Sequence, residues 1–316
     1  MTMIRYIFFG GALLASCFNA ISQRSYASNS VLNSGDWYEL SVDKPGVYKI
    51  NVTFLNLLGI NTNNLASSSI RLFGNGGMML AEANAGPWQD DLKENAIMVV
   101  DGGDGFLNGT DYILFYASGP DQWIKDSANQ RFIHQKNIYS DKAYYFLTIA
   151  GNGKRITPNP LVSSPSITIT SFSERYFHEL DTVNFLGSGK EWYGEEFSNM
   201  PGRVLTRNFL VPVPNLQNNS PVVLQTNCVA RSVAVSSRFD VSINAQPVSQ
   251  MIINPIAGGQ YDLFARQATS LGTGTATSNN INISYTYLPG SFNSQGWLNW
   301  FELFTRRNIS LNGIDQ

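Results

Sequence analysis

The side chains whose types and spacing could do chemistry lie first in the loop DGGDGFLNGTD, residues 101–111. If Gly105 takes the place of the invariant glycine of an EF-hand loop, Asp104, Asn108 and Asp111 fall on the fifth, ninth and twelfth positions, where calcium ligands occur. Asp101 adds a carboxylate one place away from the usual first position. The pattern therefore predicts a weak calcium site with Asp101, Asp104, Asn108 and Asp111 as ligands, and calcium is the one cofactor that the sequence indicates.

The same loop also has an interpretation without a metal. The first and third EF-hand positions would be Val100 and Gly102, which offer no side-chain oxygen, and the usual glutamate at the end is the shorter Asp111. Asp, Gly and Asn are also common in tight connections, here between apolar runs at 96–100 and 112–116. Spacing alone favours a simple connection between two strands, and both interpretations stay open at this point.

Nucleophilic catalysis by cysteine needs a thiolate, which a neighbouring base or positive charge normally provides. Cys228 lies within LQTNCVARS and alternates with Thr226 and Ala230, which is typical of a buried cysteine in a strand. The two histidines are His134, in FIHQK, and His178, in YFHEL. No G-x-S-x-G elbow for a serine nucleophile follows a strand pattern. The sequence therefore predicts no catalytic residue and no organic cofactor.

A third group of chemical interest is EWYGEEF, residues 191–197. Glu191, Glu195 and Glu196 could act as paired carboxylates of a glycosidase, with Trp192 and Tyr193 as stacking platforms for a sugar. Neighbours in sequence need not face each other across a bond, however, so a solvated loop anchored by its aromatic residues is the favoured interpretation.

Composition limits what these residues can belong to. The chain has 316 residues, of which 43% are hydrophobic, enough for roughly two domains with proper cores. The net charge of -2 provides no basic surface for nucleic acid, which we exclude as a partner. Only 14% of the residues are charged, while small polar residues are abundant, as is typical of β-rich exported proteins.

Short strand patterns dominate the chain. They occur at 37–42, 47–52, 69–73, 96–100, 112–116 and 143–150, and DKPG at 43–46 predicts that the first two form a hairpin. TFLNLLGI predicts one short helix, capped by Thr53 and ended by Gly59. From residue 203 onwards, strands recur without helices. We therefore expect a mainly β protein with two consecutive antiparallel β domains, the second a sandwich or jelly roll that is incomplete at its C-terminal end.

The predicted organisation begins with a signal peptide at 1–22, which has an arginine near its start, an apolar core at 6–14 and small residues before Gln23. An N-terminal β domain at 23–150, a proline-bearing linker or surface excursion at 151–171 and a sandwich domain at 172–316 follow. LASC at 14–17 also resembles a bacterial lipobox, which would place a lipid on Cys17. Ordinary cleavage is favoured over lipidation.

Six segments occur together in a recognisable order: SGDWYELSVDKPGVYKI, LFGNGGMML, DGGDGFLNGTDYILFYASGPDQW, NIYSDKAYYFLTI, GKEWYGEEF and WLNWFELFTRRNISLNG. Together they resemble the N-terminal half of the PorU family, the surface sortases of the type IX secretion system, which are related to gingipain-type cysteine peptidases. The resemblance implies a longer parent, in which a catalytic domain with a cysteine and histidine pair follows the β domains. Neither histidine of this chain lies in the His-Gly context of those peptidases, so no catalytic residue carries over.

The resemblance implies a function and a location. The parent would cleave C-terminal sorting signals from secreted cargo and attach the cargo to anionic lipopolysaccharide, at the cell surface or outer membrane of a Gram-negative bacterium. Its own catalytic domain, an outer-membrane carrier protein and the cargo would be the partners of this region. The alternative is a free-standing exported β-sandwich module that binds a ligand such as carbohydrate. Candidate aromatic residues for it are Trp297, Trp300 and Phe301, although Trp297, Glu302 and their alternating neighbours fit a sandwich strand just as well.

Overall fold

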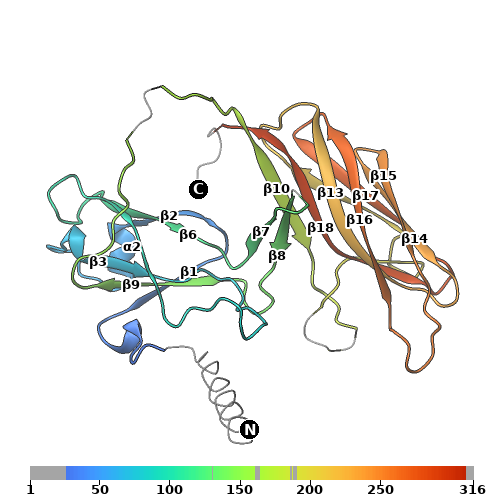
Figure 1. Cartoon of the computed structure of the whole chain (residues 1–316), viewed down its shortest axis with the longest axis horizontal. Helices are drawn as coiled ribbons and strands as arrows, with labels where there is room; N and C mark the ends of the chain where they lie inside the picture. The colour runs from blue at the N-terminus through green and yellow to red at the C-terminus, as the bar shows by residue number, and fades with distance from the viewer. Residues whose placement is uncertain (1–25, 130, 161–163, 186, 188–190, 311–316) are drawn as a thin grey trace, which may run out of the picture. The chain divides into compact units, whose positions relative to one another are not determined.

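The computed structural model describes residues 26–129, 131–160, 164–185, 187 and 191–310. The predicted signal peptide at 1–22, with Cys17, lies outside these residues. Every ladder between the labelled strands is antiparallel and helices are few, which confirms the mainly β class (Figure 1). The chain divides into two compact units: the described parts of Met1–Gln122 with Gln135–Asn159, and those of Trp123–His134 with Pro160–Gln316. Within the described residues, no helix is both long and apolar enough to cross a bilayer.

The first unit contains two small sheets and short helical segments. One sheet has the order β1 (Tyr38–Val42), β9 (Ala143–Ile149), β3 (Ile70–Phe73), β4 (Glu94–Asn95), and the other the order β2 (Gly46–Asn51), β6 (Tyr112–Ala117), β5 (Met98–Val100). The helical segments are η2 (Val31–Asn33), α2 (Val52–Leu57) and η3 (Ser67–Ser69). Apolar side chains of both sheets and of α2 meet in one core that includes Leu40, Ile50, Leu55, Leu72, Ile113, Phe115 and Leu147.

The hairpin predicted for 37–42 and 47–52 is wrong. β1 pairs with β9 over its whole length and β2 pairs with β6, so DKPG carries the chain from one sheet to the other. Gly119 packs against this connection so closely that a Cβ there would lie 2.8 Å from the Pro45 ring. The turn residues are compatible with a hairpin, but pairing with distant apolar strands decides which strands become neighbours.

The predicted helix is confirmed, with its cap moved by two residues. Asn51 is the N-cap of α2, because its Oδ1 accepts a hydrogen bond from the Phe54 N–H at 2.8 Å. Gly59 follows the helix at φ 85°, in the left-handed region where glycine ends helices without steric cost.

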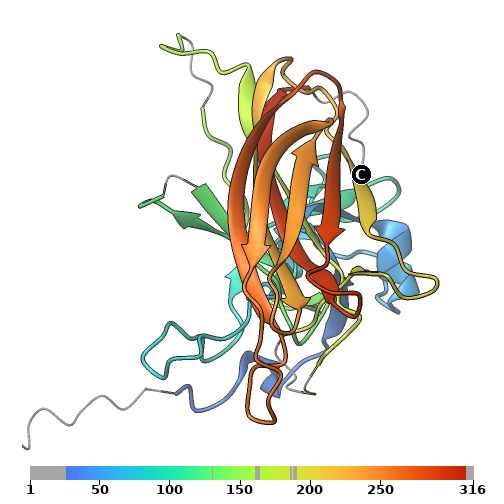
Figure 2. The same cartoon turned by 90° about the vertical axis from the view of Figure 1, so that its right-hand side faces the viewer.

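The second unit is a β-sandwich, as predicted (Figure 2). One sheet has the order β10 (Ser171–Glu179), β18 (Gln295–Asn308), β13 (Ser220–Arg231), β16 (Arg266–Ala276), with β11 (Glu196–Ser198) also paired to β18. The other has the order β12 (Thr206–Pro212), β17 (Asn280–Leu288), β14 (Ser237–Ile243), β15 (Gln246–Ile253). Side chains alternate between the interior and the outer faces, and the core includes Phe197, Cys228, Phe239, Tyr285, Tyr287, Phe301 and Leu303.

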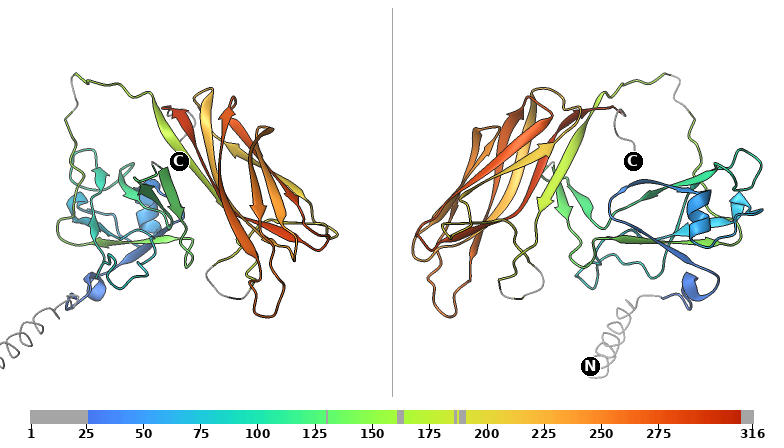
Figure 3. Two further views of the ribbon diagram at one scale, coloured as in Figure 1. Left: turned by 45° about the vertical axis from the view of Figure 1, so that its right-hand side comes forward. Right: turned by 180° about the vertical axis from the view of Figure 1, so that it is seen from behind.

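A hairpin of β7 (Gln122–Asp126) and β8 (Arg131–Gln135) packs on the outer face of the sheet that contains β10 and β18 (Figure 3). The His134 ring stacks on Phe177 at 3.8 Å between centroids, and the Trp123 ring meets Phe304 at 5.9 Å. The predicted N-terminal domain at 23–150 includes residues 123–134, whereas the structure groups this segment with the sandwich. The predicted domain ranges stay predictions.

Candidate functional site

In the loop at 101–111, the first predicted calcium ligand is held by its neighbours. The Ser67 hydroxyl donates a hydrogen bond to Asp101 Oδ2, and the Gly103 N–H donates to Asp101 Oδ1 at 3.1 Å. The hydrogen bond from Ser67 is the main reason why the pKa of the Asp101 carboxyl lies below its ordinary value. Asp101 therefore ties the loop to the segment that precedes β3.

The other three predicted ligands are hydrogen-bonded within the loop. Asp104 Oδ1 accepts from the Phe106 N–H at 2.8 Å, and Asp104 Oδ2 accepts from Asn108 Nδ2 at 3.1 Å. Asp111 Oδ2 accepts from the Asn108 N–H at 2.8 Å. The two bonds from the Phe106 and Asn108 N–H groups are of the side chain to backbone kind with which Asp stabilises turns.

In the structure the loop connects β5 with β6, as the interpretation without a metal predicts. Across the part of the chain that the structure describes, no group of three or more His, Cys, Asp and Glu side chains could hold a metal ion. The oxygens of Asp104 and Asp111 accept hydrogen bonds from donors of the loop itself. Calcium binding by Asp101, Asp104, Asn108 and Asp111 stays a prediction, which a titration can test.

Cys228 is fully buried in the sandwich core, so the predicted burial is confirmed. Burial raises the pKa of its thiol far above the ordinary value, and a hydrogen bond with Thr226 offsets only part of this effect. A thiol in such a setting is inert as a nucleophile, because the reactive species is the thiolate.

The two histidines lie on opposite faces of one sheet. His178 Nε2 lies 2.8 Å from Glu195 Oε1, and its ring stacks on Phe301 in the interior. On the outer face, the His134 N–H donates to Glu302 Oε1 at 2.6 Å. The alternation of β10 and β18 could have indicated which residues face inward, but no local spacing connects Glu302, an acidic residue inside a long apolar strand, with His134.

The structure separates the three glutamates of EWYGEEF. Glu191 Oε2 accepts a hydrogen bond from the Tyr193 hydroxyl at 2.9 Å, Glu195 binds His178, and Glu196 forms an ion pair with Arg203 at 3.0 Å. Carboxylates that act together on a glycosidic bond must face each other across the substrate. Each of these has a different partner instead, which agrees with the favoured interpretation of an anchored loop.

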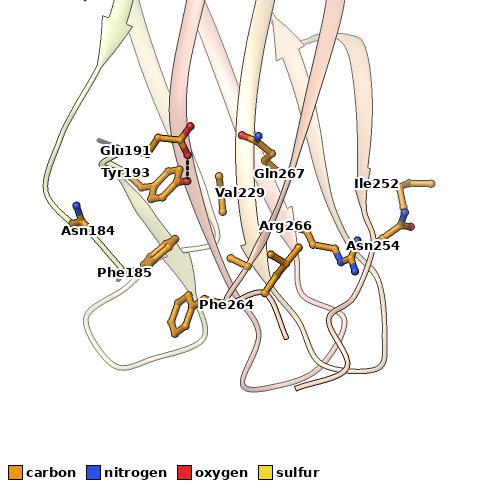
Figure 4. Close-up of a pocket in the computed structure, with 12 residues that line it drawn as sticks. Asn184, Phe185, Glu191, Tyr193, Val229, Ile252, Asn254, Phe264, Arg266 and Gln267 are labelled. Atoms are coloured by element: carbon orange, nitrogen blue, oxygen red, sulfur yellow. Dashed lines mark hydrogen bonds between the residues drawn. The ribbon is translucent and has the colours of Figure 1, made fainter. Parts of the chain in front are cut away.

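The loop nevertheless forms one wall of a pocket in the second unit. The pocket has a volume of about 500 Å³, and Figure 4 shows Glu191 and Tyr193 toward one end, Arg266 and Asn254 toward the other, and Val229 between them. Burial, together with the hydrogen bond to Glu191 and its charge, raises the pKa of Tyr193 to about 12. Its hydroxyl therefore stays protonated near neutral pH and keeps donating to Glu191.

Comparison with known proteins identifies the fold. Neither a protein-family model nor a curated protein sequence matches the chain. The crystal structure of dimeric latent PorU from Porphyromonas gingivalis matches 91% of this chain, with a TM-score of 0.74 and 23% identity. The chain covers 26% of that protein's length. At this identity the likeness shows a PorU-like fold.

Two further matches concern other classes of protein. A carbohydrate-binding module of family CBM36, in complex with calcium and xylotriose, matches 43% of this chain and 99% of its own length at 10% identity, with a TM-score of 0.24. The Cry4Aa toxin from Bacillus thuringiensis matches 91% of this chain and 44% of its own at 15% identity, with a TM-score of 0.27. At these TM-scores neither likeness carries an argument.

Proposed function

We propose that this chain is the noncatalytic N-terminal region of a PorU-type sortase of the type IX secretion system. The observation that carries the proposal is the fold likeness to PorU over 91% of the chain at a TM-score of 0.74. The six ordered sequence segments that resemble this family support it independently. The region would belong to an exported protein at the surface of a Gram-negative cell.

The proposal assigns the chemistry to another part of the parent protein. Cys228 is buried and inert, His178 pairs with Glu195, and Glu302 accepts a hydrogen bond from the His134 N–H. The region would then act by binding: it would brace or shield its own catalytic domain, or dock on an outer-membrane carrier while cargo is processed. These roles rest on likeness to the family.

An in-frame deletion of the codons for residues 26–310 in the native host tests this function. The C-termini of secreted proteins would be read by mass spectrometry in wild-type and deleted strains. We expect secreted proteins of the deleted strain to keep their C-terminal sorting signals. Normal cleavage and normal attachment to lipopolysaccharide in that strain would refute the proposal and favour a separate binding module.

A strain that carries Cys228→Ala serves as the control. Cys228 is fully buried in the core and its substitution removes only the thiol, so cargo should be processed normally in this strain. Loss of processing with stable, surface-exposed protein would instead assign catalysis to this thiol.

A further inference from the structure

The pocket in Figure 4 lies on the outer face of the sheet that contains β13 and β16. Val229 of β13 forms its floor, and Gln267 of β16 is the residue paired with Val229 across the two strands. Cys228, the neighbour of Val229, points into the core, so Val229 points outward. Val229 is nevertheless only 2% exposed, because the chain segments that build the pocket cover it.

The wall that carries Tyr193 is fixed to the sheet by several contacts. The backbone of Tyr193 exchanges hydrogen bonds with Val183 at 2.8 and 3.0 Å, and the Gly194 N–H donates to the Leu298 carbonyl at 3.0 Å. The Phe185 ring stacks on Tyr193 at 4.7 Å and meets Trp297 edge-on at 4.5 Å. Aromatic packing and backbone bonds thus hold the Tyr193 hydroxyl and its partner Glu191 in place.

The polar groups of the pocket include both hydrogen-bond donors and acceptors. Glu191 uses Oε2 for Tyr193, and Gln267 uses its carbonyl oxygen to accept from Asn227 at 3.3 Å. That bond leaves the Gln267 amide nitrogen as a donor, and the guanidinium of Arg266 and the amide of Asn254 add further hydrogen-bonding groups at the other end. One carboxylate and one guanidinium balance each other in charge.

This combination selects among classes of ligand. A phosphate or polyanion would need an excess of cationic side chains, and a lipid would need an enclosed apolar cavity. Sugar hydroxyls both donate and accept hydrogen bonds, which matches the mixed donors and acceptors of this pocket. We propose that this pocket is a binding site for a short neutral oligosaccharide, with Glu191 and Gln267 bonding hydroxyls near the Tyr193 wall and Arg266 and Asn254 bonding the far end.

The test uses the purified protein and three neutral trisaccharides: maltotriose, cellotriose and chitotriose. Binding would be measured by isothermal titration calorimetry and by saturation-transfer NMR. At least one trisaccharide should bind, and Glu191→Gln and Arg266→Ala should each weaken that sugar on the order of tenfold, as expected for lost hydrogen bonds to charged groups. Arg238→Ala is the matched control, because this partly exposed arginine lies in β14 of the other sheet and pairs with Asp240 there; it should leave the affinity unchanged.

Three results would overturn the proposal. One is the absence of binding by all three sugars up to about 10 mM, the range of weak specific sites. The second is equal weakening by Arg238→Ala, which would place the sugar elsewhere or reflect general destabilisation. The third is tighter binding of trigalacturonate or trilysine than of any neutral sugar, which would assign a charged ligand. The assay needs no cargo and no catalytic domain, so its outcome is independent of the proposed sortase role.

Discussion

Glu302 offers the most direct test of how the β7–β8 hairpin is held on the sandwich. Its side chain is almost fully buried, Oε1 accepts the hydrogen bond from the His134 N–H, and Oε2 has no hydrogen-bond partner among the described residues. Burial raises the pKa of the Glu302 carboxyl, while the bond from His134 and the positive charge of Arg131 act in the opposite direction. The ionised carboxylate is therefore less favourable in the folded protein than in the unfolded chain.

The sign of the pH dependence follows from this shift. An unfolded glutamate has a pKa of about 4.3. Because the folded-state pKa is higher, the contribution of Glu302 to stability is fully present below that value and is lost as pH rises through the folded-state pKa. Glu302→Gln keeps an acceptor for His134 and cannot ionise. The variant should therefore be more stable than the wild type at pH 7, and the difference should vanish toward about pH 4.

Glu302→Ala separates the hydrogen bond from the charge. This variant loses the hydrogen bond that the His134 N–H donates to Glu302, which costs about 1–3 kcal/mol. The alanine variant should therefore unfold at lower free energy than the glutamine variant by at least about this amount at every pH. Urea unfolding between about pH 4 and 7, followed by circular dichroism, measures both differences. A glutamine variant no more stable than wild type at pH 7, or a difference that does not change with pH, would refute the reasoning.

Three further predictions follow from local packing. Gly296→Ala would place a Cβ 2.6 Å from a ring carbon of Phe239 and should lower the free energy of unfolding, measured in urea, by about 1–3 kcal/mol. Gly259→Ala is the control and should cost little, because no atom lies within 4 Å of the added Cβ. Equal effects of the two substitutions would contradict this account of the core. The Cys228 thiol should react with Ellman's reagent only after unfolding, and rapid labelling of the native protein would show that the thiol is accessible. If the loop at 101–111 binds calcium, millimolar calcium should raise the Tm of the wild type but not of Asp104→Ala. If the wild type melts at the same temperature with calcium and with chelator, the loop is a strand connection only.

The sequence patterns correctly predicted those features of the fold that depend on residues close together in the chain. Alternation of apolar and polar residues indicated the sandwich, and the position of Cys228 in that alternation indicated its burial. The turn chemistry of DKPG did not indicate which strands pair, because β1 and β2 each find their partner about 60 residues or more away in the chain. A turn sequence permits a reversal of the chain, but the choice of partner depends on the whole sheet.

The sequence indicated only the residues of one wall of the candidate pocket. Glu191 and Tyr193 attracted notice because they are close together in the chain. Arg266 and Asn254 did not, since their place opposite Tyr193 depends on the pairing of β13 with β16 and on the return of the chain from β15. Sites assembled from separate strands give little signal in a single sequence, because no local spacing connects their members.

The assignment of the β7–β8 hairpin to the sandwich has a consequence for the order in which the chain folds. His134 must wait for Glu302, 168 residues later, so the hairpin is made long before the strand that receives it. Because so long a loop has to close first, the hairpin docks on the sandwich later than local contacts form. During synthesis from the N-terminus, Trp123 and Phe132 would lack their partners in β10 and β18 until those strands have been made. The hairpin thus stays without its docking surface until β18 has formed, and folding of the sandwich completes only when that strand is in place.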